Sequence, residues 1–63
     1  MYTYLIPYQG DLFRIILNAD GSFHSATYKP THDSYRPEPI EEDDTPIRVL
    51  QKAQELFTNE TGI

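Results

Sequence analysis

The segment 38–44 has the most unusual composition of the chain, Glu-Pro-Ile-Glu-Glu-Asp-Asp. It carries the carboxylates of Glu38, Glu41, Glu42, Asp43 and Asp44. Closely spaced carboxylates attract Lys and Arg side chains and steer the association of a basic partner. The segment therefore predicts a docking patch for a basic protein surface, including one that normally holds nucleic-acid phosphates. A solvated loop with acids near a helix start is the alternative explanation of such a charge block.

The same acids do not have the spacing of a metal site. A calcium loop needs alternating acidic ligands, a glycine and a distant bidentate glutamate, and segment 38–44 lacks that pattern. The chain contains no cysteine, which excludes a disulfide, a thiolate zinc site and a cysteine nucleophile. We therefore expect neither a metal nor another cofactor.

His32 and Asp33 come closest to an acid–base site, because a carboxylate beside an imidazole can orient it for proton transfer. No serine, threonine or further acid is placed by the sequence to complete a catalytic set. A domain of this size also rarely encloses a substrate pocket. We expect no catalytic residues, and a small hydrolase or metal-dependent enzyme is the least favoured hypothesis.

The overall charge narrows the class of partner. Ten acids oppose five bases, which gives a formal net charge of −5. Such a chain repels nucleic acids and anionic membranes, so we expect no direct binding to either. The longest aliphatic run, residues 15–17, is far too short to cross a bilayer. The first residues show neither a basic region nor a cleavage site, so we expect a cytoplasmic protein.

The 63 residues predict a single small α+β domain. Alternating apolar residues predict three antiparallel strands over 2–8, 12–18 and 22–28. Residues 29–45 contain three prolines and many acids, which predicts an extended acidic connection. Apolar residues at three- and four-residue spacing predict a helix over 46–59.

The turns define this β-β-β-α arrangement. Gln9-Gly10 predicts a two-residue hairpin loop, and the segment 18–21, Asn-Ala-Asp-Gly, predicts a type I turn followed by a left-handed glycine. Thr45 is the expected N-cap of the helix, with Pro46 in the first helical position. Asn59 or Gly62 can end the helix.

These turns also sort the side chains onto two faces of the sheet. The face that the helix should cover carries Tyr2, Tyr4, Ile6, Phe13, Ile15, Leu17 and Phe23. The other face carries Thr3, Leu5, Pro7, Leu12, Arg14, Ile16, His24, Ala26 and Tyr28. This second face is too apolar for a plain solvent surface, and a single helix cannot cover both.

We therefore interpret Arg14, Ile16, His24 and Tyr28 as partner-binding residues of the second face. Tyr35, in the connection, either binds a partner or anchors the connection onto the sheet, and both interpretations stay open.

The leading hypothesis is a non-enzymatic acidic interaction protein that docks on a basic surface of a larger protein, as an adaptor or inhibitor. An inhibitor of the phage or mobile-element type that mimics nucleic-acid charge fits the size and the acidity. The second hypothesis is a homodimer. It would form through Leu5, Leu12, Ile16 and Tyr28, or along the first strand at the sheet edge.

Overall fold

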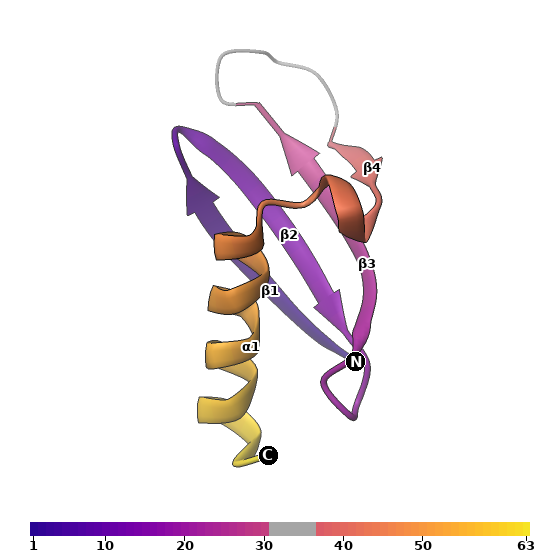
Figure 1. Ribbon diagram of the computed structural model, residues 1–63, viewed down its shortest axis with the longest axis vertical. Coiled ribbons are helices and arrows are strands. Elements are labelled where there is room, and N and C mark those ends of the chain that lie inside the picture. Colours follow the sequence, from indigo (N-terminus) through magenta and orange to yellow (C-terminus); the bar gives the residue numbers. More distant parts are fainter. Residues whose placement is uncertain (31–36) are drawn as a thin grey trace.

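The computed structural model describes residues 1–30 and 37–63. These residues form an antiparallel sheet with one α-helix across it (Figure 1). The elements are β1 (Tyr2–Tyr8), β2 (Asp11–Leu17), β3 (Phe23–Lys29), β4 (Glu38–Ile40), the 3₁₀ helix η1 (Glu42–Asp44) and α1 (Ile47–Thr61). The sheet has four strands in the order β1-β2-β3-β4. The α+β class is confirmed, whereas the prediction of three strands was wrong by one.

The additional strand, β4, lies inside the segment predicted as an extended connection. Ile40 pairs with Ala26, and Glu38 pairs with Tyr28. Pro39 is tolerated because an edge strand does not need every backbone N–H for the ladder. A strand of three residues shows too little alternation to be recognised in the sequence.

The first hairpin has the predicted register. Tyr8 pairs with Asp11 across the two-residue loop, and Tyr4 pairs with Ile15. Gln9 and Gly10 have φ angles of 51° and 83°. Two successive positive φ angles are typical of the tight turns whose twist matches that of antiparallel strands. The hairpin therefore places the even-numbered residues of β1 on the side of α1.

The second hairpin begins as predicted and then shifts. The Gly21 N–H donates to the Asn18 carbonyl at 2.9 Å, and Gly21 has a φ of 89°. Leu17 pairs with Phe23, as expected, but Ile16 pairs with Ser25. His24 is therefore the extra residue of a β-bulge, where two residues of one strand oppose one of the other.

The bulge reverses the faces that we predicted for the rest of β3. Ala26 pairs with Ile15, and Tyr28 pairs with Phe13. Since Ile15 and Phe13 point toward α1, Ala26 and Tyr28 also lie on the covered side, and their assignment to the second face was wrong. A shift of one residue moves every following side chain to the opposite face.

The start of α1 differs from the prediction, and the helix continues two residues beyond the predicted residue 59, to the second of the two candidate ends. Pro46 is the N-cap, without a side-chain capping bond, and the Thr45 hydroxyl instead donates to the Glu41 carbonyl at 2.9 Å. Gly62 ends the helix in the left-handed conformation with a φ of 78°. α1, the one α-helix of the described residues, is neither long nor apolar enough to cross a membrane.

The core lies between α1 and the sheet. The helix contributes Val49, Ala53 and Phe57 at four-residue spacing, which places them on one face. Ile47, at the start of α1, is 70% exposed and does not belong to this face. The buried apolar residues are Ile6, Phe13, Ile15, Leu17, Ala26, Val49, Ala53 and Phe57.

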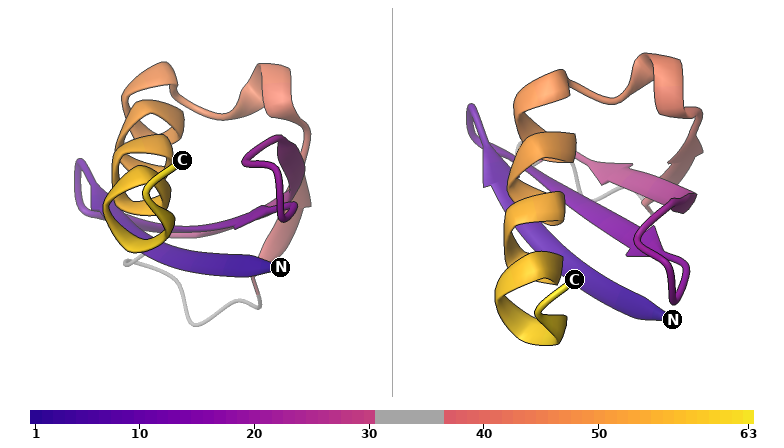
Figure 2. Two further views of the ribbon diagram at one scale, coloured as in Figure 1. Left: turned by 90° about the horizontal axis from the view of Figure 1, so that it is seen from below. Right: turned by 60° about the horizontal axis from the view of Figure 1, so that its bottom comes forward.

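One helix does not cover the whole sheet. α1 packs on β1 and β2, whereas η1 packs on β3. A helix with its side chains is about 10 Å wide and neighbouring strands are about 4.8 Å apart, so α1 spans roughly two strands. Figure 2 shows α1 and η1 standing on the same side of the sheet.

Gly21 gives a test of how closely the second hairpin approaches the helix. A Cβ atom at Gly21 would lie 2.8 Å from Cε2 of the buried Phe57, whereas one at Gly62 would meet nothing within 4 Å. Both positions have a positive φ, which is unfavourable for alanine. We expect Gly21→Ala to lower the free energy of unfolding by about 2–4 kcal/mol, and Gly62→Ala by about 1 kcal/mol. Equal losses in urea denaturation would contradict the contact with Phe57.

Candidate functional site

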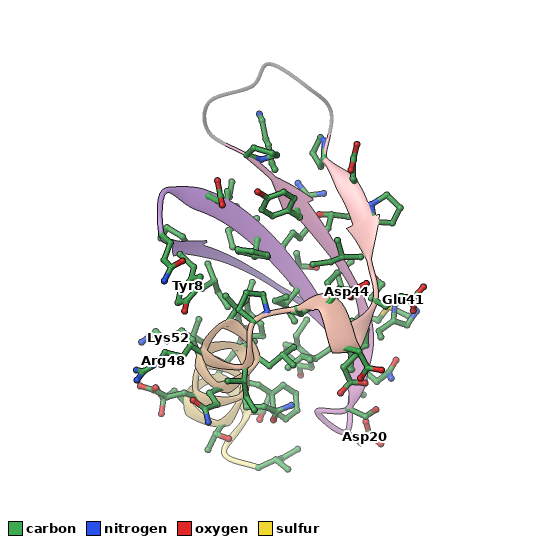
Figure 3. The ribbon with its side chains drawn as sticks, turned by 45° about the horizontal axis from the view of Figure 1, so that its top comes forward. Tyr8, Asp20, Glu41, Asp44, Arg48 and Lys52 are labelled. Carbon is green, nitrogen blue, oxygen red and sulfur yellow. The ribbon has the colours of Figure 1, made fainter. Side chains whose placement is uncertain are left out.

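The predicted acids form one surface, which we call the acidic ridge. It consists of the carboxylates of Glu38, Glu41, Glu42, Asp43 and Asp44, along β4 and η1, and all five residues are exposed. Glu38 pairs with Tyr28 and so lies on the same side of the sheet as α1. Figure 3 shows Glu41 and Asp44 at η1. The structure therefore places these five sequence-predicted residues along one continuous segment formed by β4 and η1.

Backbone hydrogen bonds fix the shape of the acidic ridge. The Asp44 N–H donates to the Glu41 carbonyl, and the Thr45 N–H donates to the Glu42 carbonyl, each at 3.1 Å. The Thr45 side chain, which is 6% exposed, adds its hydroxyl bond to the Glu41 carbonyl. The carboxylates of Glu42, Asp43 and Asp44 consequently project from a turn that three hydrogen bonds close.

No cation of the described residues lies within ion-pair distance of the acidic ridge. The ion pair found in residues 1–30 and 37–63 joins Lys52 to Glu55 at 3.7 Å, on the exposed side of α1. Arg48 and Lys52 are each two positions from Leu50, which is about 200° around the helix. Figure 3 shows both cations on the side of α1 away from Glu41 and Asp44. Within residues 1–30 and 37–63, the negative charge of the ridge therefore has no ion-pair partner.

A hollow lies beside the acidic ridge, and the sequence interpretation missed it. Its volume is about 450 Å³, and its lining consists of Leu17, Ser22, Phe23, Glu42, Leu50 and Gln54. Phe23 and Leu50 are half-buried, so the hollow has an apolar floor, and Glu42 joins it to the ridge. The width of one helix against several strands is the signal that could have predicted such a gap.

The turn between β2 and β3 borders the hollow and carries a further acid. Asp20 Oδ1 accepts two hydrogen bonds from Ser22, one from the hydroxyl at 2.6 Å and one from the backbone N–H at 2.9 Å. These hydrogen bonds stabilise the carboxylate and lower the pKa of Asp20 below its ordinary value. Figure 3 shows Asp20 on the same side of α1 as Glu41 and Asp44.

The face of the sheet opposite α1 and η1 forms a separate surface, which we call the open face. Arg14 and Ile16 lie there, as predicted, and Leu5 is 57% exposed. A shallow hollow of about 140 Å³ is lined by Leu5, Leu12, Arg14, Thr27, Lys29 and Pro37. The open face is opposite α1 and η1 (Figure 2), so the acids and the predicted sheet-face residues do not form a single site.

The remaining predicted residues have other surroundings. The Tyr28 hydroxyl donates to Asp11 Oδ2 at 3.1 Å, and its ring centroid lies 5.1 Å from that of Phe13, on the covered side. His24 is exposed at the bulge, with Nδ1 3.2 Å from the Ser25 hydroxyl. Tyr35 lies outside the described residues, as do His32 and Asp33 of the acid–base hypothesis.

Within residues 1–30 and 37–63, no three His, Asp or Glu side chains converge in an arrangement that could hold a metal ion. No family model, curated protein or solved structure matches the chain.

The charge of Asp20 gives a test in solution. Because its folded-state pKa is lowered, the carboxylate favours the fold above the ordinary pKa of 3.8, and that contribution is lost as the pH falls through the folded-state value. We expect Ser22→Ala to raise the pKa of Asp20 toward 3.8, since the hydroxyl bond is lost. Carboxyl NMR titration measures it, with Ser25→Ala as the control. An unchanged Asp20 titration in Ser22→Ala would contradict the assignment.

Proposed function

We propose that the protein is a non-enzymatic interaction protein that docks its acidic ridge on a basic surface of a larger protein. The observation that carries the proposal is the ridge itself. Its five carboxylates are exposed, and no cation of the described part of the chain pairs with them. Exposed carboxylates on one surface attract the Lys and Arg side chains of a basic partner.

The fixed shape of η1 also supports docking. A preorganised group of charges loses little conformational entropy when it binds, so more of the electrostatic attraction remains as affinity. A surface that holds phosphates can also accept closely spaced carboxylates, because Arg and Lys bind both. An adaptor or an inhibitor that mimics nucleic-acid charge is the form of the function that this chemistry favours.

The proposal is tested with a labelled peptide that has a serine between two pairs of lysines. Replacing Glu41, Glu42, Asp43 and Asp44 with Gln or Asn should raise its Kd by about tenfold at low ionic strength, because each exposed charge pair contributes roughly 0.2–1 kcal/mol. The dependence of Kd on salt should also become weaker. Fluorescence anisotropy measures both quantities.

Two double variants that remove the same number of charges test whether the position of the charges, and not only their number, determines the affinity. Glu41→Gln with Glu42→Gln removes two charges from the acidic ridge, and Glu55→Gln with Glu60→Gln removes two from α1. The ridge pair should weaken binding more than the helix pair. Equal effects, or an affinity that does not change in the fourfold ridge variant, would reject the ridge as the docking surface.

The open face supports a second candidate function, a homodimer. Leu5 and Ile16 lie on that face, and β1 is an edge strand with a free backbone side. Arg14 and Lys29 also lie on the open face, and none of the described acids lies there to pair with them. Two open faces in contact would bring like charges together, which places this candidate second.

Light scattering over a range of concentrations tests the homodimer. The candidate predicts a mass that rises toward twice that of the chain, and a return to monomer in Leu5→Lys. Ile47→Lys is the control, because Ile47 is 70% exposed on α1, on the other side of the sheet. A monomer at every concentration would remove this candidate and leave the ridge proposal unaffected.

A further inference from the structure

The hollow beside the acidic ridge has walls from three separate parts of the fold. Leu17 and Phe23 come from the sheet, Leu50 and Gln54 from α1, and Glu42 from η1. Leu50 and Gln54 are four positions apart and so share one helix face. The hollow exists because α1 lies over β1 and β2, and η1 packs on β3. Its walls belong to elements that the core holds in place.

The lining has the chemistry of an anchor site. Leu17 is 1% exposed at its base, and Phe23 and Leu50 each leave apolar surface in contact with water. Ser22, Gln54 and Glu42 supply polar groups at its border. A volume of about 450 Å³ is within the range of sites that bind apolar groups. An aromatic side chain would fill such a space and remove the exposed apolar floor from water.

The negative charge around the hollow indicates what kind of molecule would supply the aromatic side chain. Glu42 belongs both to the hollow and to the acidic ridge, and Asp20 lies in the turn that leads to Ser22. The helix cations Arg48 and Lys52 point away from this side (Figure 3). A second copy of the chain, with a net charge of −5, would be repelled. A segment with Lys or Arg next to the aromatic residue would be attracted.

We infer that the hollow holds one aromatic side chain of a basic protein segment, whose flanking Lys or Arg residues contact the acidic ridge. This inference rests on the proposed function and names the partner more closely. A few buried aromatic anchors usually supply most of the binding energy of an interface, and the surrounding charges supply orientation and rate. The ridge and the hollow together form one composite surface.

Two labelled peptides test the inference. One has phenylalanine between two pairs of lysines, and the other is the serine peptide used above. Burial of the aromatic ring should make the phenylalanine peptide bind about tenfold more tightly to the unmodified protein. A third peptide, with phenylalanine between serines, tests whether an uncharged apolar group is sufficient.

Variants of α1 locate the aromatic ring. Leu50→Trp places a large side chain in the hollow and should remove the tenfold difference between the peptides. Gln51→Trp adds the same side chain at an exposed position of α1, outside the hollow, and should keep the difference. NMR on the unmodified protein gives a measurement that does not depend on the folding of a variant. The phenylalanine peptide should shift the amide signals of Ser22, Phe23, Leu50 and Gln54.

The outcomes separate the two proposals. If the two lysine peptides bind equally, the anchor site is rejected and the ridge function stands. If neither binds, the ridge function fails, and the inference fails with it. Shifts confined to the open face, or equally tight binding of the peptide without lysines, would also overturn the inference. The tenfold difference, its loss in Leu50→Trp and the shifts around the hollow support it.

Discussion

A single α-helix has to shield one side of a four-stranded sheet, and most features of this protein depend on that constraint. Val49, Ala53 and Phe57 bury the middle of α1 against β1 and β2. A helix is about as wide as two strands, so β3 and β4 need another cover. The turn of η1 partly supplies it by packing on β3. Within residues 1–30 and 37–63, the parts of the sheet that α1 and η1 leave uncovered are the hollow on one side and the open face on the other.

The same arrangement determines where the charges lie. The η1 turn is the most acidic part of the chain, and its packing on β3 brings the acidic ridge to the same side as the hollow. Arg48 and Lys52 lie on the far side of α1 (Figure 3), and Arg14 and Lys29 lie on the open face. Within the described residues, the fold therefore keeps these four cations away from the acidic ridge. Charge separation of this kind favours binding to oppositely charged partners over the repulsive approach of identical surfaces.

Close contacts at the second hairpin fix the position of the turn between β2 and β3 relative to α1. Gly21 approaches Phe57 so closely that a Cβ atom has no room, and Gln54 donates a hydrogen bond to the Gly21 carbonyl. The turn is thus tied to the middle of α1 at the edge of the hollow. The neighbouring bulge at His24 turns Ala26 and Tyr28 toward the core. The residues that form the turn and the bulge are therefore also the ones that pack against the helix and the core.

The sequence by itself determined the local features. The alternation of β1, the Gln9-Gly10 and 18–21 turns and the apolar stripe of α1 all depend on neighbouring residues, and the structure agrees with them. The tertiary structure decided what depends on distant pairing. The β4 strand forms because its backbone pairs with β3. The bulge shifts the register of β3 by one residue and so moves the side chains that follow it to the opposite face of the sheet. The hollow forms because rigid elements of unequal width meet, which no local pattern encodes.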